Sequence, residues 1–205
     1  MTVTDVNVVK SAIFERPDDA NKGTLGSLLC VCGSYGMAGA AVMSAKGALR
    51  TGIGLAKCAL PRSIYPIVAQ TILESVYYSL SENADGRISK VNVPFLVSES
   101  CKSSATLVGC GLGVCDDTLK IVFSLIENST TPLVLDADAL NCVAKQPEIL
   151  LKKKAPIIIT PHPGEMSRLT GLATPLVNAE RERVALDFAQ KYGVVTCLLY
   201  TSPSP

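Results

Sequence analysis

Short apolar runs alternate with longer amphipathic segments along most of this 205-residue chain. The runs are unbroken and rich in β-branched residues, a pattern typical of strands that are buried on both faces of a parallel sheet. They predict strands at 27–32, 55–60, 75–80, 105–108, 132–135, 156–159 and 194–199. Apolar residues at helical spacing predict helices between several of these strands, at 38–51, 116–128 and 177–192.

This alternation predicts an α/β fold, in which a mostly parallel, doubly wound sheet carries helices on both faces. We assign residues 1–199 to a single domain and 200–205 to an irregular tail. The start of the chain and the segment 81–90 are also expected to be irregular. In sheets of this kind ligands bind beyond the carboxyl ends of the strands. The turns that follow the strands are therefore where we look for function.

Composition narrows the class of protein. Hydrophobic residues make up 48% of the chain, which is enough for one core in a chain of this length. The 19 basic residues are matched by 18 acidic ones, and the lysines at 152–154 suit a solvated helix end, so we expect no nucleic-acid partner. The eight cysteines contain no C-x-x-C pair, and the chain opens without a signal-peptide pattern. We expect a cytoplasmic protein with reduced thiols, no zinc site and no membrane span.

Two turns are rich in small residues. Gly33 to Ala41 follow the first predicted strand and lead into a helix, where free backbone amides favour phosphate or another anion. The glycines match neither the dinucleotide fingerprint nor the Walker loop, so tight strand–helix packing is an equal alternative. Gly109 to Gly113 repeat the arrangement after the fourth strand. Alternating glycines suit a ligand that lies against the main chain, and a flexible turn would look the same.

Acidic residues follow the fifth predicted strand. Asp136 is placed to hold the loop or a cation-bound water, whereas Asp138 can be the N-cap of the next helix. Paired carboxylates near phosphates usually act through Mg²⁺.

The turn after the sixth strand holds His162, the one histidine of the chain. A lone histidine is often structural, but Pro161 and Pro163 fix the backbone on both sides of it, which favours a functional role. Glu165 falls in the first turn of the following helix, where it can orient metal-bound water or a proton network beside a phosphate.

In order and spacing these turns resemble those of the ADP- or ATP-dependent NAD(P)H-hydrate dehydratases, a ribokinase-like family. The matching stretches are 22–26, 33–41, 48–55, 109–113, 136–141 and 160–166. The resemblance implies a ribokinase-like fold and the repair of a damaged cofactor. Hydrated NADH or NADPH would be phosphorylated on its ring hydroxyl by ADP or ATP, and loss of phosphate would restore the ring. The small residues of the first loop are more similar to those of the bacterial, ADP-using enzymes than to those of the eukaryotic enzymes.

The resemblance also implies roles for individual residues. The implied contacts to the hydrated dinucleotide are Gly39, Ala40 or its neighbour Ala41, Gly111 and His162. The implied nucleotide and phosphate side consists of Asp136, Asn141 and Glu165. Glu165 has the spacing of the acid in the superfamily's N-x-x-E element, which is linked to Mg²⁺, with His162 in place of the asparagine. We expect its contact to the metal to pass through water.

Two features depart from the family. Asn21 stands where many relatives have histidine before Lys-Gly. After Val195 relatives continue into a Leu-Lys-Gly turn and a Gly-Gly-x-Gly-Asp element, whose aspartate is implied to be the general base. This chain has no Gly-x-Gly-Asp. We interpret its end as a truncation or a frame shift, and expect an incomplete sheet, marginal folding, no catalytic base and no turnover.

Two other functions stay open on the sequence. One is a dinucleotide-binding module without catalysis, and the other is a ribokinase-like kinase for a vitamin or sugar. For the dehydratase, the resemblance implies hydrated NADH or NADPH as substrate, ADP or ATP as co-substrate, and Mg²⁺. The resemblance is also compatible with two kinds of partner. One is further copies of the chain in a homo-oligomer, which is a tetramer in relatives, and the other is an epimerase domain or protein that acts on the same substrate.

Overall fold

The computed structural model describes residues 18, 20–21 and 23–199. In this part of the chain seven strands form one sheet, and every neighbouring pair is parallel. The strands are β1 (Ser27–Val31), β2 (Leu55–Pro61), β3 (Val76–Leu80), β4 (Ala105–Val108), β5 (Leu133–Leu135), β6 (Ile157–Ile159) and β7 (Val195–Thr196). Their order across the sheet is β3-β2-β1-β4-β5-β6-β7.

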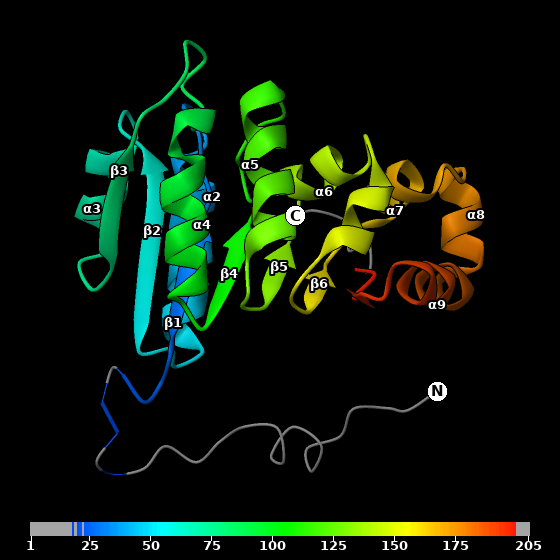
Figure 1. Cartoon of the computed structure of the whole chain (residues 1–205), viewed down its shortest axis with the longest axis horizontal. Helices are drawn as coiled ribbons and strands as arrows, with labels where there is room; N and C mark the ends of the chain where they lie inside the picture. The colour runs from blue at the N-terminus through cyan, green and yellow to red at the C-terminus, as the bar shows by residue number, and fades with distance from the viewer. Residues whose placement is uncertain (1–17, 19, 22, 200–205) are drawn as a thin grey trace.

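Helices cover both faces of the sheet. They are α2 (Ala38–Arg50), α3 (Tyr65–Thr71), α4 (Val93–Cys101), α5 (Asp116–Asn128), α6 (Asp138–Val143), α7 (Pro163–Thr170), α8 (Thr174–Ala179) and α9 (Arg181–Tyr192), with short 3₁₀ turns η1 (Lys90–Asn92) and η2 (Pro147–Lys152). In Figure 1 α4 and α5 lie in front of the sheet, whereas α2 and α3 lie behind it. Two separate apolar cores result, a small one under α2 and α3 and a large one on the opposite face. The predicted α/β fold is confirmed.

The strand predictions agree with the structure to within two residues, except at β7. Only Val195–Thr196 is a regular strand there, although hydrogen bonds from Cys197 N to Ile159 O and from Leu199 N to Pro161 O continue the parallel pairing. The single helix predicted over 177–192 is wrong. Two helices, α8 and α9, meet at Glu180, whose φ of −124° and ψ of 40° lie outside the helical region.

Burial on both faces, as predicted for the strands, holds for β1 and β2 but not for β5 and β6. Leu135 and Ile159 are fully buried in the large core. On the other face Val134 is half-buried and Ile158 is 36% exposed. The cause is the coverage of that face, because the small core under α2 and α3 is built on β1, β2 and their neighbours.

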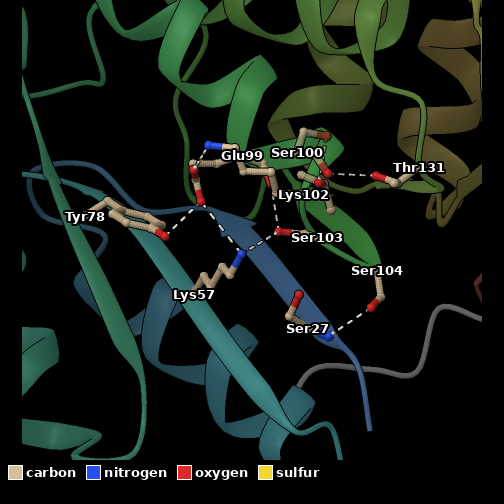
Figure 2. Close-up of polar contacts among 10 residues, drawn as sticks. Ser27, Lys57, Tyr78, Glu99, Ser100, Lys102, Ser103, Ser104 and Thr131 are labelled. Carbon is tan, nitrogen blue, oxygen red and sulfur yellow. Dashed lines mark hydrogen bonds and ion pairs between the residues drawn. The ribbon is translucent and has the colours of Figure 1, made fainter. Parts of the chain in front are cut away.

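A charge network centred on the buried Glu99 links α4 to β2 and β3 (Figure 2). Glu99 of α4 lies 3.7 Å from Lys57 Nζ and accepts hydrogen bonds from the Tyr78 hydroxyl at 2.8 Å and from Lys102 Nζ at 3.0 Å. Lys57 Nζ also donates to Ser103 Oγ at 3.3 Å. The hydrogen bond from Lys102 holds the pKa of Glu99 below its usual value, although burial opposes this shift. The charged form is therefore the one that the fold stabilises.

The strand order reverses between β1 and β4. β1 has β2 on one side and β4 on the other, and its residue Val31 pairs with Ala59 and with Val108. In a doubly wound sheet this reversal opens a crevice outside the carboxyl ends of the two central strands, where ligands bind. The two glycine-rich loops follow β1 and β4, so both lie at this crevice. No helix in the described part of the chain has the length and apolar character needed to cross a bilayer.

Candidate functional site

The two glycine-rich loops are joined at the point where the strand order reverses. Gly33 N donates to Cys110 O, and the buried Ser34 hydroxyl donates to Gly111 O, each at 2.8 Å. Gly111 has a φ of +65°, and a Cβ at this position would lie 2.7 Å from the Cβ of Ala40. A side chain at position 111 would therefore strain the loop and displace the first turn of α2. The structure brings these two predicted substrate residues into contact.

The first turn of α2 presents small residues with different exposure. Gly39 is exposed, with no atoms within 4 Å of the position where a Cβ would be. Ala40 is half-buried, whereas Ala41 is buried in the small core, 3.1 Å from the position of a Cβ on Gly33. Met37 is the N-cap residue, and no side chain caps the helix. Of the two alanines named from the sequence, Ala40 is the one with accessible surface.

Asp136 connects the ends of three strands. Its Oδ1 accepts a hydrogen bond from the Thr160 hydroxyl at 2.8 Å, and its Oδ2 lies 3.3 Å from the Cys110 thiol, which donates to it. Thr160 follows β6 and Cys110 follows β4, while Asp136 itself follows β5. Both carboxylate oxygens are thus engaged in holding neighbouring loops together.

Asp138 does not cap the next helix, so the capping interpretation is wrong. Ala137 is the N-cap residue of α6, and Asp138 is its first helical residue. The Asp138 Oδ2 instead accepts from Gly113 N at 2.8 Å, and its Oδ1 accepts from Asn141 Nδ2 at 3.2 Å. Asn141 Oδ1 in turn accepts from Arg168 Nε at 2.8 Å. A chain of polar contacts therefore runs from the second glycine loop through α6 to α7.

His162 and Glu165 form a reciprocal capping box at the start of α7. The backbone N–H of His162 donates to Glu165 Oε2 at 2.9 Å, and Gly164 N donates to His162 Nδ1 at 3.0 Å. Because Nδ1 is an acceptor, a neutral imidazole carries its proton on Nε2, which lies 3.4 Å from Glu165 Oε1. The imidazole is 48% exposed, whereas the carboxyl is buried. This burial raises the pKa of Glu165, while the bond from the His162 amide opposes the rise.

The described residues offer no ready-made metal site. Among them no group of three His, Cys, Asp or Glu side chains is arranged to hold an ion. Both oxygens of Asp136 are hydrogen-bonded, and both oxygens of Glu165 face His162. These carboxyls do not fit direct coordination of Mg²⁺ as they stand, and the water-mediated contact of Glu165 stays a prediction.

Sequence reasoning missed three residues that the geometry adds, namely Ser34, Thr160 and Arg168. Thr160 could have been found, because β5 and β6 are successive strands and the residues that end them meet at the sheet edge. Arg168 follows Glu165 by three residues on one helix face, a spacing that also predicts proximity. Ser34 carried no signal of its own, since its partner is a backbone carbonyl of a distant loop.

Together the sheet order and the position of these loops define a ribokinase-like α/β protein. A ribokinase-like superfamily protein from Enterococcus faecalis has this fold, with a TM-score of 0.73 and 20% identity over 92% of this chain and 62% of its own. At the sequence level the family model described as NAD(P)H-hydrate dehydratase matches residues 28–202. The chain belongs to the NAD(P)H-hydrate dehydratase family.

Two relatives show how much of the family's length this chain covers. It is 38% identical to the bifunctional NAD(P)H-hydrate repair enzyme Nnr of Thermofilum pendens, over 86% of this chain and 34% of that protein. It is also similar to the crystal structure of the ADP/ATP-dependent NAD(P)H-hydrate dehydratase of Bacillus subtilis, which was co-crystallised with ATP and Mg²⁺. The TM-score is 0.76 and the identity 27%, over 95% of this chain and 65% of that one. The chain thus spans about a third of the first relative and about two thirds of the second.

Proposed function

We propose that this chain carries the substrate side of an ADP-dependent NAD(P)H-hydrate dehydratase. The observation that carries the proposal is the contact between Gly111 and Ala40 where the strand order reverses, next to the open backbone of Gly39. A planar nicotinamide ring or a ribose can approach a main chain that lacks side chains. Family membership and the name of the B. subtilis relative support the choice of hydrated NADH or NADPH as the ligand.

The proposed reaction has two steps. The ring hydroxyl of the hydrated dinucleotide attacks the terminal phosphoryl group of ADP, which releases AMP and a proton. Phosphate then leaves the ring carbon, and the substrate also loses a proton. This elimination restores the double bond of the reduced nicotinamide. Phosphoryl transfer depends mainly on positioning and on charge stabilisation, which loop amides and a few side chains can supply. We propose that His162, whose imidazole is 48% exposed, contacts the substrate.

The proposal includes Mg²⁺ and a second repair activity. When bound, the ion would neutralise charge on the phosphates, and Glu165 would contact it through water. No step is assigned to the metal, because the two nearby carboxyls are already engaged. The T. pendens relative is named a bifunctional repair enzyme. This name supports a partner, an epimerase that acts on the same substrate. We propose that the reaction takes place in the cytoplasm.

Gly111→Ala tests the proposal. We expect it to weaken binding of NADH at least about tenfold in a fluorescence titration, because the added Cβ meets α2 and the positive φ disfavours alanine. Gly47→Ala is the matched control, since Gly47 lies within α2 with open space around it and should bind NADH as the unsubstituted chain does. Equal binding by both variants would contradict the placement of the dinucleotide.

A further inference from the structure

A pocket of about 390 Å³ adjoins the candidate site between the second glycine loop, α6 and α7. Its lining consists of Val114, Asn141, Ala144, Lys145 and Arg168. Two of these five side chains are cationic, and none is acidic. Val114 directly follows the glycine loop, and Arg168 lies on the helix that His162 and Glu165 begin. The pocket therefore adjoins the second glycine loop and shares Asn141 with the implied nucleotide and phosphate side.

Arg168 is held in place by the polar chain that starts at the glycine loop. Its Nε donates to Asn141 Oδ1 at 2.8 Å, and Asn141 is fixed by its own bond to Asp138. This contact uses one edge of the guanidinium. Within the part of the chain that the structure describes, the two terminal nitrogens of Arg168 have no hydrogen-bond acceptor or ion-pair partner. A positioned cation with free donors suits an oxyanion.

Lys145 adds a second positive charge to the lining of the pocket. It follows α6, its side chain is exposed, and among the described residues no carboxylate lies within ion-pair distance of its ammonium. Two acidic groups are linked to Arg168. Asp138 is connected to it through Asn141, and the buried Glu165, which faces His162, also interacts with the charge of Arg168. The side chains that line the pocket itself carry two positive charges and no negative one.

We propose that this pocket binds a phosphate group of the dinucleotide, with Arg168 and Lys145 as the charged contacts. The inference rests on the proposed function. A guanidinium presents paired N–H donors that match two phosphate oxygens, whereas an ammonium acts as a point charge. The dinucleotide has two sources of such a group, the pyrophosphate that NADH and NADPH share and the 2′-phosphate that only NADPH carries.

Fluorescence titrations with NADPH and with NADH test the pocket. Arg168→Gln and Lys145→Gln should each weaken binding about tenfold, because each removes a charge-assisted contact. Arg168→Lys should recover part of the loss, and the effect should shrink at high salt. A loss confined to NADPH identifies the 2′-phosphate as the bound group, and an equal loss for both dinucleotides identifies the pyrophosphate. Arg50→Gln, at the exposed end of α2, is the control and should change neither affinity.

Failure of this inference can be told apart from failure of the proposed function. If the unsubstituted chain binds the dinucleotides and both glutamine variants bind them equally well, the phosphate pocket is overturned while the function stands. If the unsubstituted chain binds neither dinucleotide, the function and the pocket fall together. The Lys145 side chain makes no hydrogen bond to another described residue. A loss of binding in Lys145→Gln therefore reports the missing charge and not a disturbed fold.

Discussion

Ala137 is the residue with the least ordinary backbone in the site. Its φ of 51° and ψ of −114° make it the one non-glycine residue with positive φ in the described part of the chain. Side chains of L-residues are strained there. The conformation separates two aspartates in the chain, so that Asp136 meets Thr160 while Asp138 reaches the amide of Gly113. Backbone strain at this point therefore serves the arrangement of both carboxylates.

Replacing Ala137 by glycine should relieve this strain. We expect Ala137→Gly to raise the free energy of unfolding by about 1 kcal/mol, which is the strain energy less the entropy cost of a glycine. Ala189→Gly, within α9, should instead lower it by about 1 kcal/mol, because that residue is helical. Urea unfolding measures both. Destabilisation of similar size in the two variants would show that position 137 is not strained.

Glu165 should make stability depend on pH. Burial raises the pKa of its carboxyl, so the folded state holds this proton more tightly than the unfolded state does. The resulting contribution is complete below the unfolded pKa of about 4.3 and is lost as pH rises through the folded value. Glu165→Gln does not lose stability in this way, because glutamine has no carboxyl proton to release. Its free energy of unfolding relative to the unsubstituted chain should therefore increase as the pH is raised from about 4 towards neutrality.

The exposed Glu182 of α9 provides the control for this experiment. Glu182→Gln should leave the pH profile of urea unfolding parallel to that of the unsubstituted chain. A profile for Glu165→Gln that stays parallel, or that falls with pH, would contradict the raised pKa.

For single residues, the sequence predicted which polar side chains lie at the strand ends. It did not predict which residues they contact. Glu165 was expected in the first turn of α7 and lies there, but its contact with His162 was not predicted. Capping preference failed for Asp138, because it is a local rule and the partner, Gly113, is distant in sequence. The proximity of Arg168 to Glu165 could have been predicted from their spacing, whereas its contact with Asn141 of another helix could not.

Among the elements, α4 is linked to the sheet by polar contacts of Glu99. The side chains of Lys57 and Glu99 are 12% and 11% exposed, and they link this helix to β2 (Figure 2). Glu99→Ala should lower the free energy of unfolding by about 3 kcal/mol, because it leaves a buried ammonium with Ser103 as its described partner. Urea unfolding measures this loss.

A double variant distinguishes charge from packing. Lys57→Met combined with Glu99→Leu should recover most of the lost stability, since an apolar pair of similar volume leaves no unpaired charge. If Glu99→Ala costs less than about 1 kcal/mol, the network contributes little, as exposed ion pairs do.

Element prediction worked where the hydrophobic signal was long or regular. Unbroken β-branched runs gave the strands, and α2 and α5, of 13 residues each, gave clear helical periods. The shorter α3 and α6, of 7 and 6 residues, are too brief for a period to show. The break at Glu180 was invisible for another reason, because apolar spacing continues across it from Val177 to Val184.

For the molecule as a whole, the two faces of the sheet are covered unevenly. Ile158 is 36% exposed and Val195 is 60% exposed, although both belong to strands. Exposed apolar side chains on strands promote association. We expect the chain to aggregate on heating and Ile158→Thr to reduce light scattering without loss of the folded signal, whereas Val134→Thr, at a half-buried position, should lower stability as well. A soluble, cooperative melt of the unsubstituted chain would contradict this expectation.

The central claim is that the reversal of strand order between β1 and β4 forms the substrate side of a dinucleotide-repair site. Calorimetric titration of the chain with hydrated NADPH and with NADPH tests it most directly. We predict that both dinucleotides bind and that Gly111→Ala weakens the binding of both. Failure of the unsubstituted chain to bind either form of NADPH would contradict the claim.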